Sequence, residues 1–273
     1  MIRSSAMMMV CLCGVALLTG EAREFEVRLL KGDGKNGFWG TREFSMHVSS
    51  LGVIRYLQVN GKELIWQAAA LYTRPVAPGE KQGLRTVQGE GFGKRGLTMV
   101  APLRRTESQR GKRIFEFTHQ IAKPQILEGR TLCEVKQRIV ITPTGEIDVT
   151  YDCHWLETVR WHGFDILIIF NKESVSRRRC IVYAKDNVHD HVLELDQGSA
   201  IKNRIRDELR QLCIWSAEGP FHLLWQERAS SRFSWYKRAE TYFRPPAVPY
   251  RGIVYKGQRS RIAYRILLPV SQQ

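Results

Sequence analysis

The chain has 273 residues and a formal net charge of +15, from 42 Lys and Arg against 27 Asp and Glu. A chain of this length builds one large domain with its own core, or two small ones, and does not depend on disulfides for stability. The basic excess favours anionic partners such as acidic polysaccharides, lipid headgroups or nucleic acid, unless it serves solubility alone.

Residues 1–22 have the layout of a secretory signal peptide. Arg3 supplies an early positive charge, an apolar run follows from Met7 to Leu18, and small residues stand at Gly20 and Ala22 as a cleavage site. This apolar run is too short to span a bilayer, which takes about 20 apolar residues. An uncleaved anchor and a different start codon are the alternatives.

A cleaved signal predicts an exported protein, periplasmic or extracellular, whose single domain spans 23–273 with no membrane span. Nucleic acid then becomes a poor candidate partner, and an external carbohydrate a better one. The even number of cysteines after the signal permits two disulfides or free buried thiols. These cysteines are Cys133, Cys153, Cys180 and Cys213.

Alternation of apolar and polar residues, which is typical of half-buried strands, dominates the chain after the signal. Residues 53–59 and 62–66 flank Asn60-Gly61, a pair that suits a type I′ turn, and they predict a hairpin. The nearly continuous apolar run at 164–170 predicts a strand covered on both faces. Further strands are expected at 25–29, 115–121, 135–141, 147–155, 212–215 and 221–225, with a closing hairpin of 251–255 and 261–268.

Helical patterns are scarce. Apolar residues recur at near-helical spacing only in 200–211, which predicts one short helix. A strand-helix-strand rhythm, which would indicate a parallel α/β sheet, is missing from the pattern. The sequence therefore predicts an all-β protein, a large antiparallel β-sandwich with few or no helices apart from the signal segment.

Three segments carry a family resemblance. LGVIRYLQVNGKELIW at 51–66 resembles the N-terminal hairpin of galactose mutarotase-like proteins, the superfamily of the aldose 1-epimerases. RGIVYKGQRSRIAYRILLP at 251–269 is similar to the last hairpin of that superfamily, and QRIVITPTGEIDVTYDCHWLE at 137–157 to its paired central strands. The resemblance implies a supersandwich fold with a carbohydrate-binding concave face.

The chain also departs from that family. The Asn-His-x-Tyr-Phe-Asn-Leu motif, which carries the acid histidine of aldose 1-epimerases, has no match in this sequence. Glu227 and Glu240 lie in the part of the chain where those enzymes carry their glutamate base, but neither matches its motif. The resemblance therefore assigns no catalytic residue.

Acid–base candidates come from a separate local cluster. A histidine with a carboxylate partner can serve as acid and base at a sugar ring near neutral pH. The candidates are His154, Glu157 and His162, with Asp152 and Asp165 beside them. The alternative is that both histidines are ordinary strand-end and loop residues.

Aromatic and basic residues suggest a ligand surface. Rings can stack on a sugar face, and neighbouring cations can bind a carboxylate or sulfate. The candidates are Trp161, Trp235, Tyr236, Arg238 and Arg244. The alternative places these rings in the core, with the basic residues at its rim.

Metal and cofactor sites are not expected. Two histidines in His189-Asp190-His191 have the spacing of a zinc pair, but the flanking residues indicate a turn rather than further ligands. Gly89–Lys94 lacks the Gly-Lys-Ser/Thr ending of a phosphate-binding loop.

Together these patterns predict an exported carbohydrate-binding β-sandwich protein that acts on sugars or acidic polysaccharide. Whether it is catalytic stays open, with a divergent carbohydrate-active enzyme as one form of this hypothesis. The alternative is a non-catalytic, envelope-associated structural protein that binds polyanions through its basic surface.

Overall fold

The computed structural model describes residues 26–73, 85–88, 98–122, 131–195, 204–225, 230–236, 238–244 and 252–270, with only the backbone at several strand ends. The expected signal segment at 1–22, the loop at Gly89–Lys94 and Glu227 lie outside these residues. Within these ranges the chain forms twenty strands and one four-residue helix, α1 (Lys172–Val175). The expectation of an all-β protein is confirmed.

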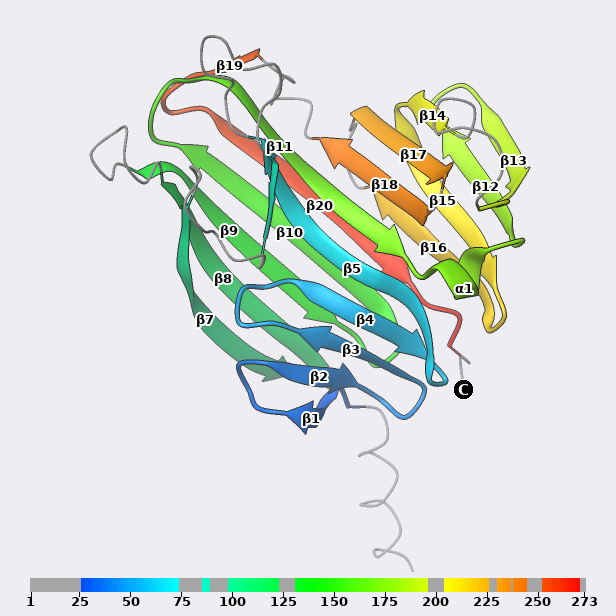
Figure 1. Cartoon of the computed structure of the whole chain (residues 1–273). Coiled ribbons are helices and arrows are strands. Elements are labelled where there is room, and N and C mark those ends of the chain that lie inside the picture. Colours follow the sequence, from blue (N-terminus) through cyan, green and yellow to red (C-terminus); the bar gives the residue numbers. More distant parts are fainter. Residues whose placement is uncertain are drawn as a thin grey trace, which may run out of the picture.

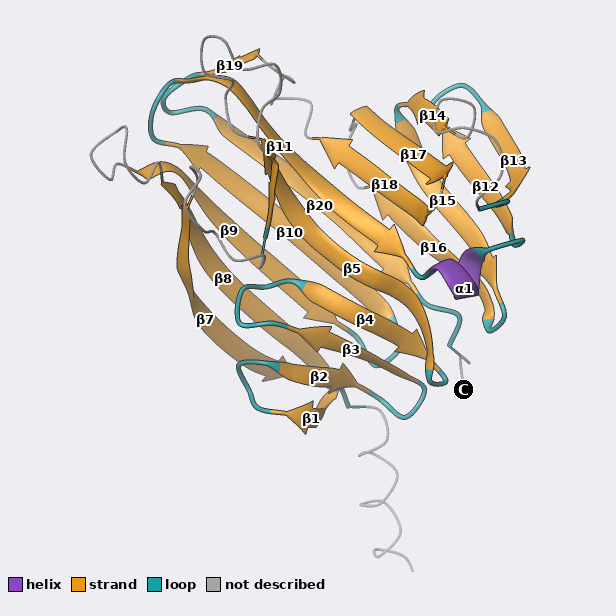
Figure 2. Ribbon diagram, in the orientation of Figure 1, coloured by secondary structure: helices purple, strands orange, loops and turns teal. Residues whose placement is uncertain are grey.

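The strands form two antiparallel sheets packed face to face (Figures 1 and 2). The eleven-stranded sheet runs in the order β1-β2-β3-β4-β5-β11-β18-β17-β14, with β6 paired to β5 and β19 to β11. Its strands are β1 (Arg28–Gly32), β2 (Gly37–Gly40), β3 (Phe44–Val48), β4 (Ile54–Val59), β5 (Lys62–Thr73), β6 (Arg85–Val87), β11 (Val159–Phe170), β14 (Arg204–Asp207), β17 (Ser230–Tyr236), β18 (Arg238–Arg244) and β19 (Gly252–Val254).

The second sheet is nine-stranded, in the order β13-β12-β15-β16-β20-β10-β9-β8-β7. Its strands are β7 (Thr98–Gln109), β8 (Lys112–Ala122), β9 (Thr131–Ile141), β10 (Glu146–Trp155), β12 (Arg179–Ala184), β13 (Val188–Val192), β15 (Leu209–Ser216), β16 (Gly219–Trp225) and β20 (Arg259–Leu267). The chain crosses from this sheet to the other between β10 and β11.

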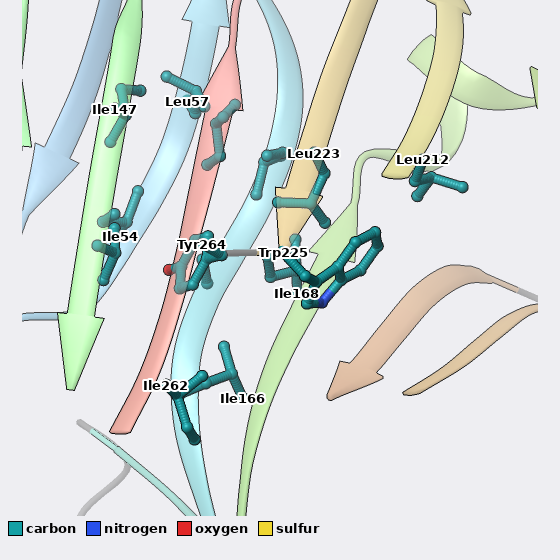
Figure 3. Packing of buried hydrophobic residues seen from close by; sticks show 14 of the residues in the cluster. Ile54, Leu57, Ile147, Ile166, Ile168, Leu212, Leu223, Trp225, Ile262 and Tyr264 are labelled. Carbon is teal, nitrogen blue, oxygen red and sulfur yellow. The ribbon is translucent and has the colours of Figure 1, made fainter. Parts of the chain in front are cut away.

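Alternate residues of both sheets meet in one hydrophobic core (Figure 3). Ile54 and Ile168 come from the eleven-stranded sheet, and Ile147, Tyr264 and Leu223 from the nine-stranded sheet. The strand at 164–170 is buried at every position, as its apolar run predicted. The core is therefore built by the period-two pattern that the sequence shows.

The hairpin predicted around Asn60-Gly61 is confirmed. Val59 pairs with Lys62, and Asn60 and Gly61 have φ values of 48° and 78°, as a type I′ turn requires. A Cβ at Gly61 would meet nothing within 4 Å, so only the backbone angle demands glycine at this position.

Gly61→Ala is therefore expected to lower the free energy of unfolding by about 1 kcal/mol, because alanine is strained at positive φ. Gly34→Ala is the matched control, since a Cβ at Gly34 also meets nothing within 4 Å and its φ lies outside the strained range. Urea unfolding of both variants measures the difference. Equal stabilities of the two variants would contradict the assigned turn.

Two sequence expectations are wrong in detail. The helix expected at 200–211 is replaced, over its described part, by β14 and the start of β15, which pair with β17 and with β12 and β16. The strands of the closing hairpin exist, but β19 pairs with β11 while β20 pairs with β10 and β16. The turn at 256–257 therefore connects the two sheets instead of closing a hairpin.

Cys133, Cys153, Cys180 and Cys213 are free, buried thiols in this structure. Cys133 and Cys153 lie on neighbouring strands, and burial raises the pKa of Cys133. Within the described ranges, no helix is long and apolar enough to cross a membrane.

One polar cluster lies inside the sandwich. We call Gln88, His119, Gln137 and Tyr151 the glutamine cluster. Gln137 donates from Nε2 to the Gly52 carbonyl at 2.7 Å and to the Tyr151 hydroxyl at 2.9 Å. Its Oε1 accepts from Gln88 Nε2 at 3.0 Å and lies 3.0 Å from His119 Nε2.

Gln88 connects this cluster to the eleven-stranded sheet. Its backbone N–H donates to the Ala70 carbonyl at 2.8 Å, and its side-chain oxygen accepts from the Ala70 N–H at 3.0 Å. Gln88 Nε2 also donates to the Leu51 carbonyl. Because His119, Gln137 and Tyr151 belong to the nine-stranded sheet, the cluster joins the two sheets through the core.

Candidate functional site

A continuous set of paired residues crosses the outer face of the eleven-stranded sheet. From β2 to β17 these residues are Phe38, His47, Arg55, Gln67, Ile169, Glu240 and Ser234, each in register with the next. On each strand at least one neighbour of these residues, such as Met46, Ala68 or Ile168, belongs to the core, so this set faces away from it. The outer face therefore carries polar and aromatic side chains.

The centre of this outer face is enclosed. Gln67 is 1% exposed and Asp165 6%, yet neither belongs to the hydrophobic core, and Leu167 and Ile169 are similarly covered. We call Gln67, Ala69, Asp165, Leu167 and Ile169 the enclosed face. A carboxylate and an amide so far removed from solvent must have polar partners within the protein, and together they form the polar centre of this outer face.

The outer face of the nine-stranded sheet provides the contrast. Its side chains alternate with core residues in the same way, but Asp152 and Arg261 are each 57% exposed. Glu116 and Arg138 are about half exposed and form an ion pair at 3.6 Å. Near-complete coverage of outward-facing residues is therefore a property of the centre of the eleven-stranded sheet and not of outer faces in general.

Charged groups stand around the enclosed face. Arg55 pairs in register with Gln67, and Glu240 with Ile169. Arg232 is half-buried and alternates with the core residue Phe233, so it lies on the same outer face. Cationic and anionic groups therefore border the enclosed face.

His47 adds a titratable group beside Arg55. Burial and the neighbouring Arg55 guanidinium lower the pKa of His47 below its ordinary value. At neutral pH its imidazole is therefore uncharged and offers one donor and one acceptor. An amide, a carboxylate, a neutral imidazole and a guanidinium together can bind hydroxyl groups from both the donor and the acceptor side.

The three acid–base candidates lie around the crossover between the sheets. His154 stands near the end of β10, opposite Glu134 and Arg259 on the outer face of the nine-stranded sheet. Glu157 is half-buried in the crossover, and His162 pairs with Gly252 on β19.

Two carboxylates that the sequence grouped with these candidates are separated. Asp152 shares the outer face of His154 in the nine-stranded sheet, whereas Asp165 belongs to the enclosed face of the other sheet. Asp152 and His154 therefore lie on one outer face and Asp165 on the other, with Glu157 in the crossover between them.

The aromatic and basic candidates are also divided. Trp235 is 5% exposed and lies in the core, with its ring centroid 5.4 Å from that of Phe233 and 4.8 Å from that of His191. Tyr236 and Arg238 pair with each other at the β17–β18 turn. Trp235 is therefore a core residue, which is the alternative that the sequence left open. The side chains of Tyr236 and Arg238, and also of Trp161, His162 and Arg244, lie outside the described part.

The backbone nevertheless places Arg244 near the enclosed face. The β11–β18 register ends with Ile166 opposite Phe243. Continuing this register by one residue places Arg244 opposite Asp165. Arg244 is thus the one basic candidate whose register position adjoins the buried carboxylate.

His189 and His191 stack at 6.2 Å on the edge strand β13, and Asp190 binds Arg179 with its carboxylate at 2.6 Å. Among the residues that the structure describes, no group of three or more His, Cys, Asp or Glu is arranged to hold a metal ion.

Sequence reasoning named Arg232 among the basic residues for an anionic sugar but missed Arg55 and Gln67 as site residues. A signal for both existed. Arg55 follows Ile54 directly, and Gln67 interrupts an otherwise apolar stretch before Ala68. Their shared position on the outer face depends on strand pairing, which no local pattern contains.

The arrangement of strands also agrees with a known protein. The structure is similar to that of galactose 1-epimerase from Lactobacillus acidophilus NCFM, with a TM-score of 0.52 at 7% sequence identity, covering 89% of this chain and 98% of the epimerase. The chain has the galactose mutarotase-like supersandwich fold. The expected resemblance is therefore confirmed for the fold, and this degree of identity assigns no activity.

Two larger enzymes show weaker likeness. Heparan sulfate lyase HepC from Pedobacter heparinus gives a TM-score of 0.49 at 10% identity, covering 91% of this chain and 37% of the lyase. Alpha-N-acetylgalactosaminidase NagBb from Bifidobacterium bifidum gives 0.47 at 9% identity, covering 86% and 36%. No protein-family model matches the chain, and no curated protein matches it either.

Proposed function

We propose that this supersandwich protein binds carbohydrate on the enclosed face of its eleven-stranded sheet. The observation that carries the proposal is the polar outer face, on which half-buried Arg55, Arg232 and Glu240 border Gln67 and Asp165 outside the hydrophobic core. Sugar sites need an apolar surface for the ring and a few fixed polar groups for the hydroxyls. Ala69 and Leu167 supply the first, and Gln67 and Asp165 the second.

The nature of the sugar follows from the bordering charges. Arg55 and Arg232 lie on the same outer face, and guanidinium groups bind carboxylate and sulfate in a planar, two-pronged geometry. This supports acidic as well as neutral sugars as partners. We further propose that the protein works after export, where such polysaccharides are accessible, on the strength of the signal-like segment at 1–22.

The alternative function, polyanion binding through a basic surface, has less support. On the outer face of the nine-stranded sheet acids and bases alternate and pair, as Asp148 does with Arg265 at 2.6 Å and Glu134 with Lys136 at 3.8 Å. Such pairing cancels the local positive potential. Binding through a basic surface would weaken steeply as salt rises, whereas binding of a neutral sugar on the enclosed face would change little.

We also keep His154, Glu157 and His162 as the proposed acid–base groups of a carbohydrate-active enzyme. Their support is their position around the crossover and the chemistry of a histidine with a carboxylate. Because His154 lies on the outer face of the nine-stranded sheet, these groups would serve a sugar bound at the crossover and not one on the enclosed face. If turnover of a sugar is found, the double variant His154→Ala, His162→Ala tests the assignment. Unchanged turnover in the folded variant would remove both histidines from it.

Asp165→Asn is expected to weaken sugar binding by about tenfold or more, because a hydrogen bond to a charged group contributes about 1.5–3 kcal/mol. The variant keeps the size of the side chain and removes its charge. A glycan array of neutral and acidic sugars identifies the ligand, and titration calorimetry compares the affinities.

Asp152→Asn is the matched control, since Asp152 is an exposed carboxylate on the outer face of the other sheet. Thermal unfolding confirms that both variants are folded. Loss of binding in Asp152→Asn with full binding in Asp165→Asn would show that the sugar binds on the nine-stranded sheet, and would contradict the proposal.

A further inference from the structure

Four aromatic side chains gather beside the enclosed face, on consecutive strands β2 to β5. We call Phe38, His47, Tyr56 and Trp66 the aromatic patch. The ring centroids of Phe38 and His47 are 5.3 Å apart, and those of His47 and Tyr56 are 6.4 Å apart. Phe38 and Tyr56 lie nearly parallel, at 22° and 6.5 Å. Phe38, His47 and Tyr56 therefore form an ordered group of rings.

The patch is open to solvent, in contrast to the enclosed face. Tyr56 is 37% exposed and Trp66 is 41% exposed. Between the pairs Arg55–Gln67 and Leu57–Ile65, the register sets these two aromatic residues opposite each other. Two large rings exposed side by side cost solubility and stability, which indicates a binding role.

The backbone at Tyr56 supports that role. Tyr56 and Leu57 of β4 lie opposite a single residue of β3, so β4 has a bulge at this point. Tyr56 has a φ of +52°, and the other non-glycine residues with positive φ lie in turns. A bulge changes the direction in which a side chain points. An aromatic residue at positive φ is strained, and such strain is typically retained at functional sites.

We propose that the aromatic patch is a second sugar subsite, so that the protein binds an oligosaccharide and not a single sugar. This inference rests on the proposed function of the enclosed face. A sugar ring on Gln67 and Asp165 would be continued by a further ring that stacks on Tyr56 and Trp66. The apolar C–H face of a pyranose packs well against such aromatic faces.

The two subsites are continuous. Arg55 pairs in register with His47 on one side and with Gln67 on the other. From β4 to β11 there are two strand spacings, roughly 10 Å, which leaves room for more than one sugar ring. Arg55 stands between the subsites, where its guanidinium can bind a hydroxyl or a uronate carboxylate of the bridging unit.

The test compares chain lengths in the full-length protein. The probes are galactose, galacturonate and the tetrasaccharide of each, measured by titration calorimetry. We expect the better tetrasaccharide to bind the wild type about tenfold more tightly than its monosaccharide. Tyr56→Ala should abolish this gain and leave monosaccharide affinity unchanged.

The matched control is Tyr183→Ala, because Tyr183 is 36% exposed and lies on the nine-stranded sheet. It should keep the full gain with chain length. Tyr56→Gly guards against a misfolded variant: glycine tolerates the positive φ, so its melting temperature should exceed that of Tyr56→Ala, with the same loss of the gain.

Three results would overturn the subsite. The first is that Tyr56→Ala keeps the full gain in affinity from monosaccharide to tetrasaccharide. The second is that it weakens monosaccharide and tetrasaccharide binding equally. The third is that the substitution dissociates a dimer, which would make the patch an interface between copies. Failure of the wild type to bind any of the sugars would instead overturn the proposed function itself.

Discussion

Replacing Gln137 by leucine is expected to lower the free energy of unfolding by about 4 kcal/mol. The glutamine amide is 2% exposed and makes four polar contacts, to Gly52, Tyr151, Gln88 and His119. A buried donor or acceptor that loses its partner costs about 1–3 kcal/mol. Gln88 still donates to the Leu51 carbonyl and Tyr151 to Gln88 Oε1, so the Gly52 carbonyl and the His119 ring bear most of the loss.

Urea unfolding of Gln137→Leu and the wild type measures this loss. The control is Gln120→Leu, because Gln120 is exposed on the neighbouring strand and should change stability by no more than about 0.5 kcal/mol. If both variants lost equal stability, the glutamine cluster would have no special role in joining the sheets.

The stability of the protein is expected to fall by about 3 kcal/mol between pH 6.5 and pH 4 because of His119 alone. His119 is fully buried, and burial lowers its pKa from 6.5 to about 4. Gln88 Oε1 accepts from Ala70, so Gln88 Nε2 must donate to Gln137 Oε1, and His119 Nε2 must donate to that same oxygen.

Protonation of His119 would therefore place its new N–H at Nδ1. Within the described residues this atom is buried and has no hydrogen-bond partner. The folded state thus binds the proton more weakly than the unfolded state does. The contribution to stability is complete above the unfolded pKa of 6.5 and is lost as the pH falls towards the folded pKa.

Other groups also titrate in acid, so the contribution of His119 is measured as the difference in stability between two proteins. Thermal and urea unfolding of the wild type and His119→Leu, from pH 7 to pH 4, isolates the contribution of this histidine. We expect the variant to lose much less stability over this range. Parallel pH curves for the two proteins would contradict the buried neutral imidazole.

Much of the fold could be predicted from residue patterns. Apolar residues at every second position predicted the strands, and Asn60-Gly61 predicted a turn that the positive φ values confirm. Which sheet a strand joins was harder. Residues 252–254 read as half of a hairpin, but they pair with β11, because pairing depends on contacts that are distant in sequence.

The glutamine cluster had a sequence signal that went unused. His119 follows Phe115 and Phe117 on the apolar side of its strand, and Gln137 lies between Val135 and Ile139. A polar residue on an apolar face indicates a buried hydrogen-bonding partner. The partners themselves, such as Gln88, come from elsewhere in the chain and could not be named.

The candidate site could be predicted only in part. Asp165 and Glu240 were noticed in the sequence, but neither was assigned to a shared surface. Tyr56 carried a local signal, since Arg55 and Tyr56 break the alternation between Ile54 and Leu57, as a bulge does. The coverage of Gln67 and Asp165 follows from the shape of the whole sheet, which short motifs do not encode.

A structure of the protein with its best-binding oligosaccharide tests the central claim most directly. Our account predicts a sugar ring over Gln67 and Asp165, with the next ring against Tyr56 and Trp66. An oligosaccharide held instead on the outer face of the nine-stranded sheet, against Asp152 and Arg261, would contradict it.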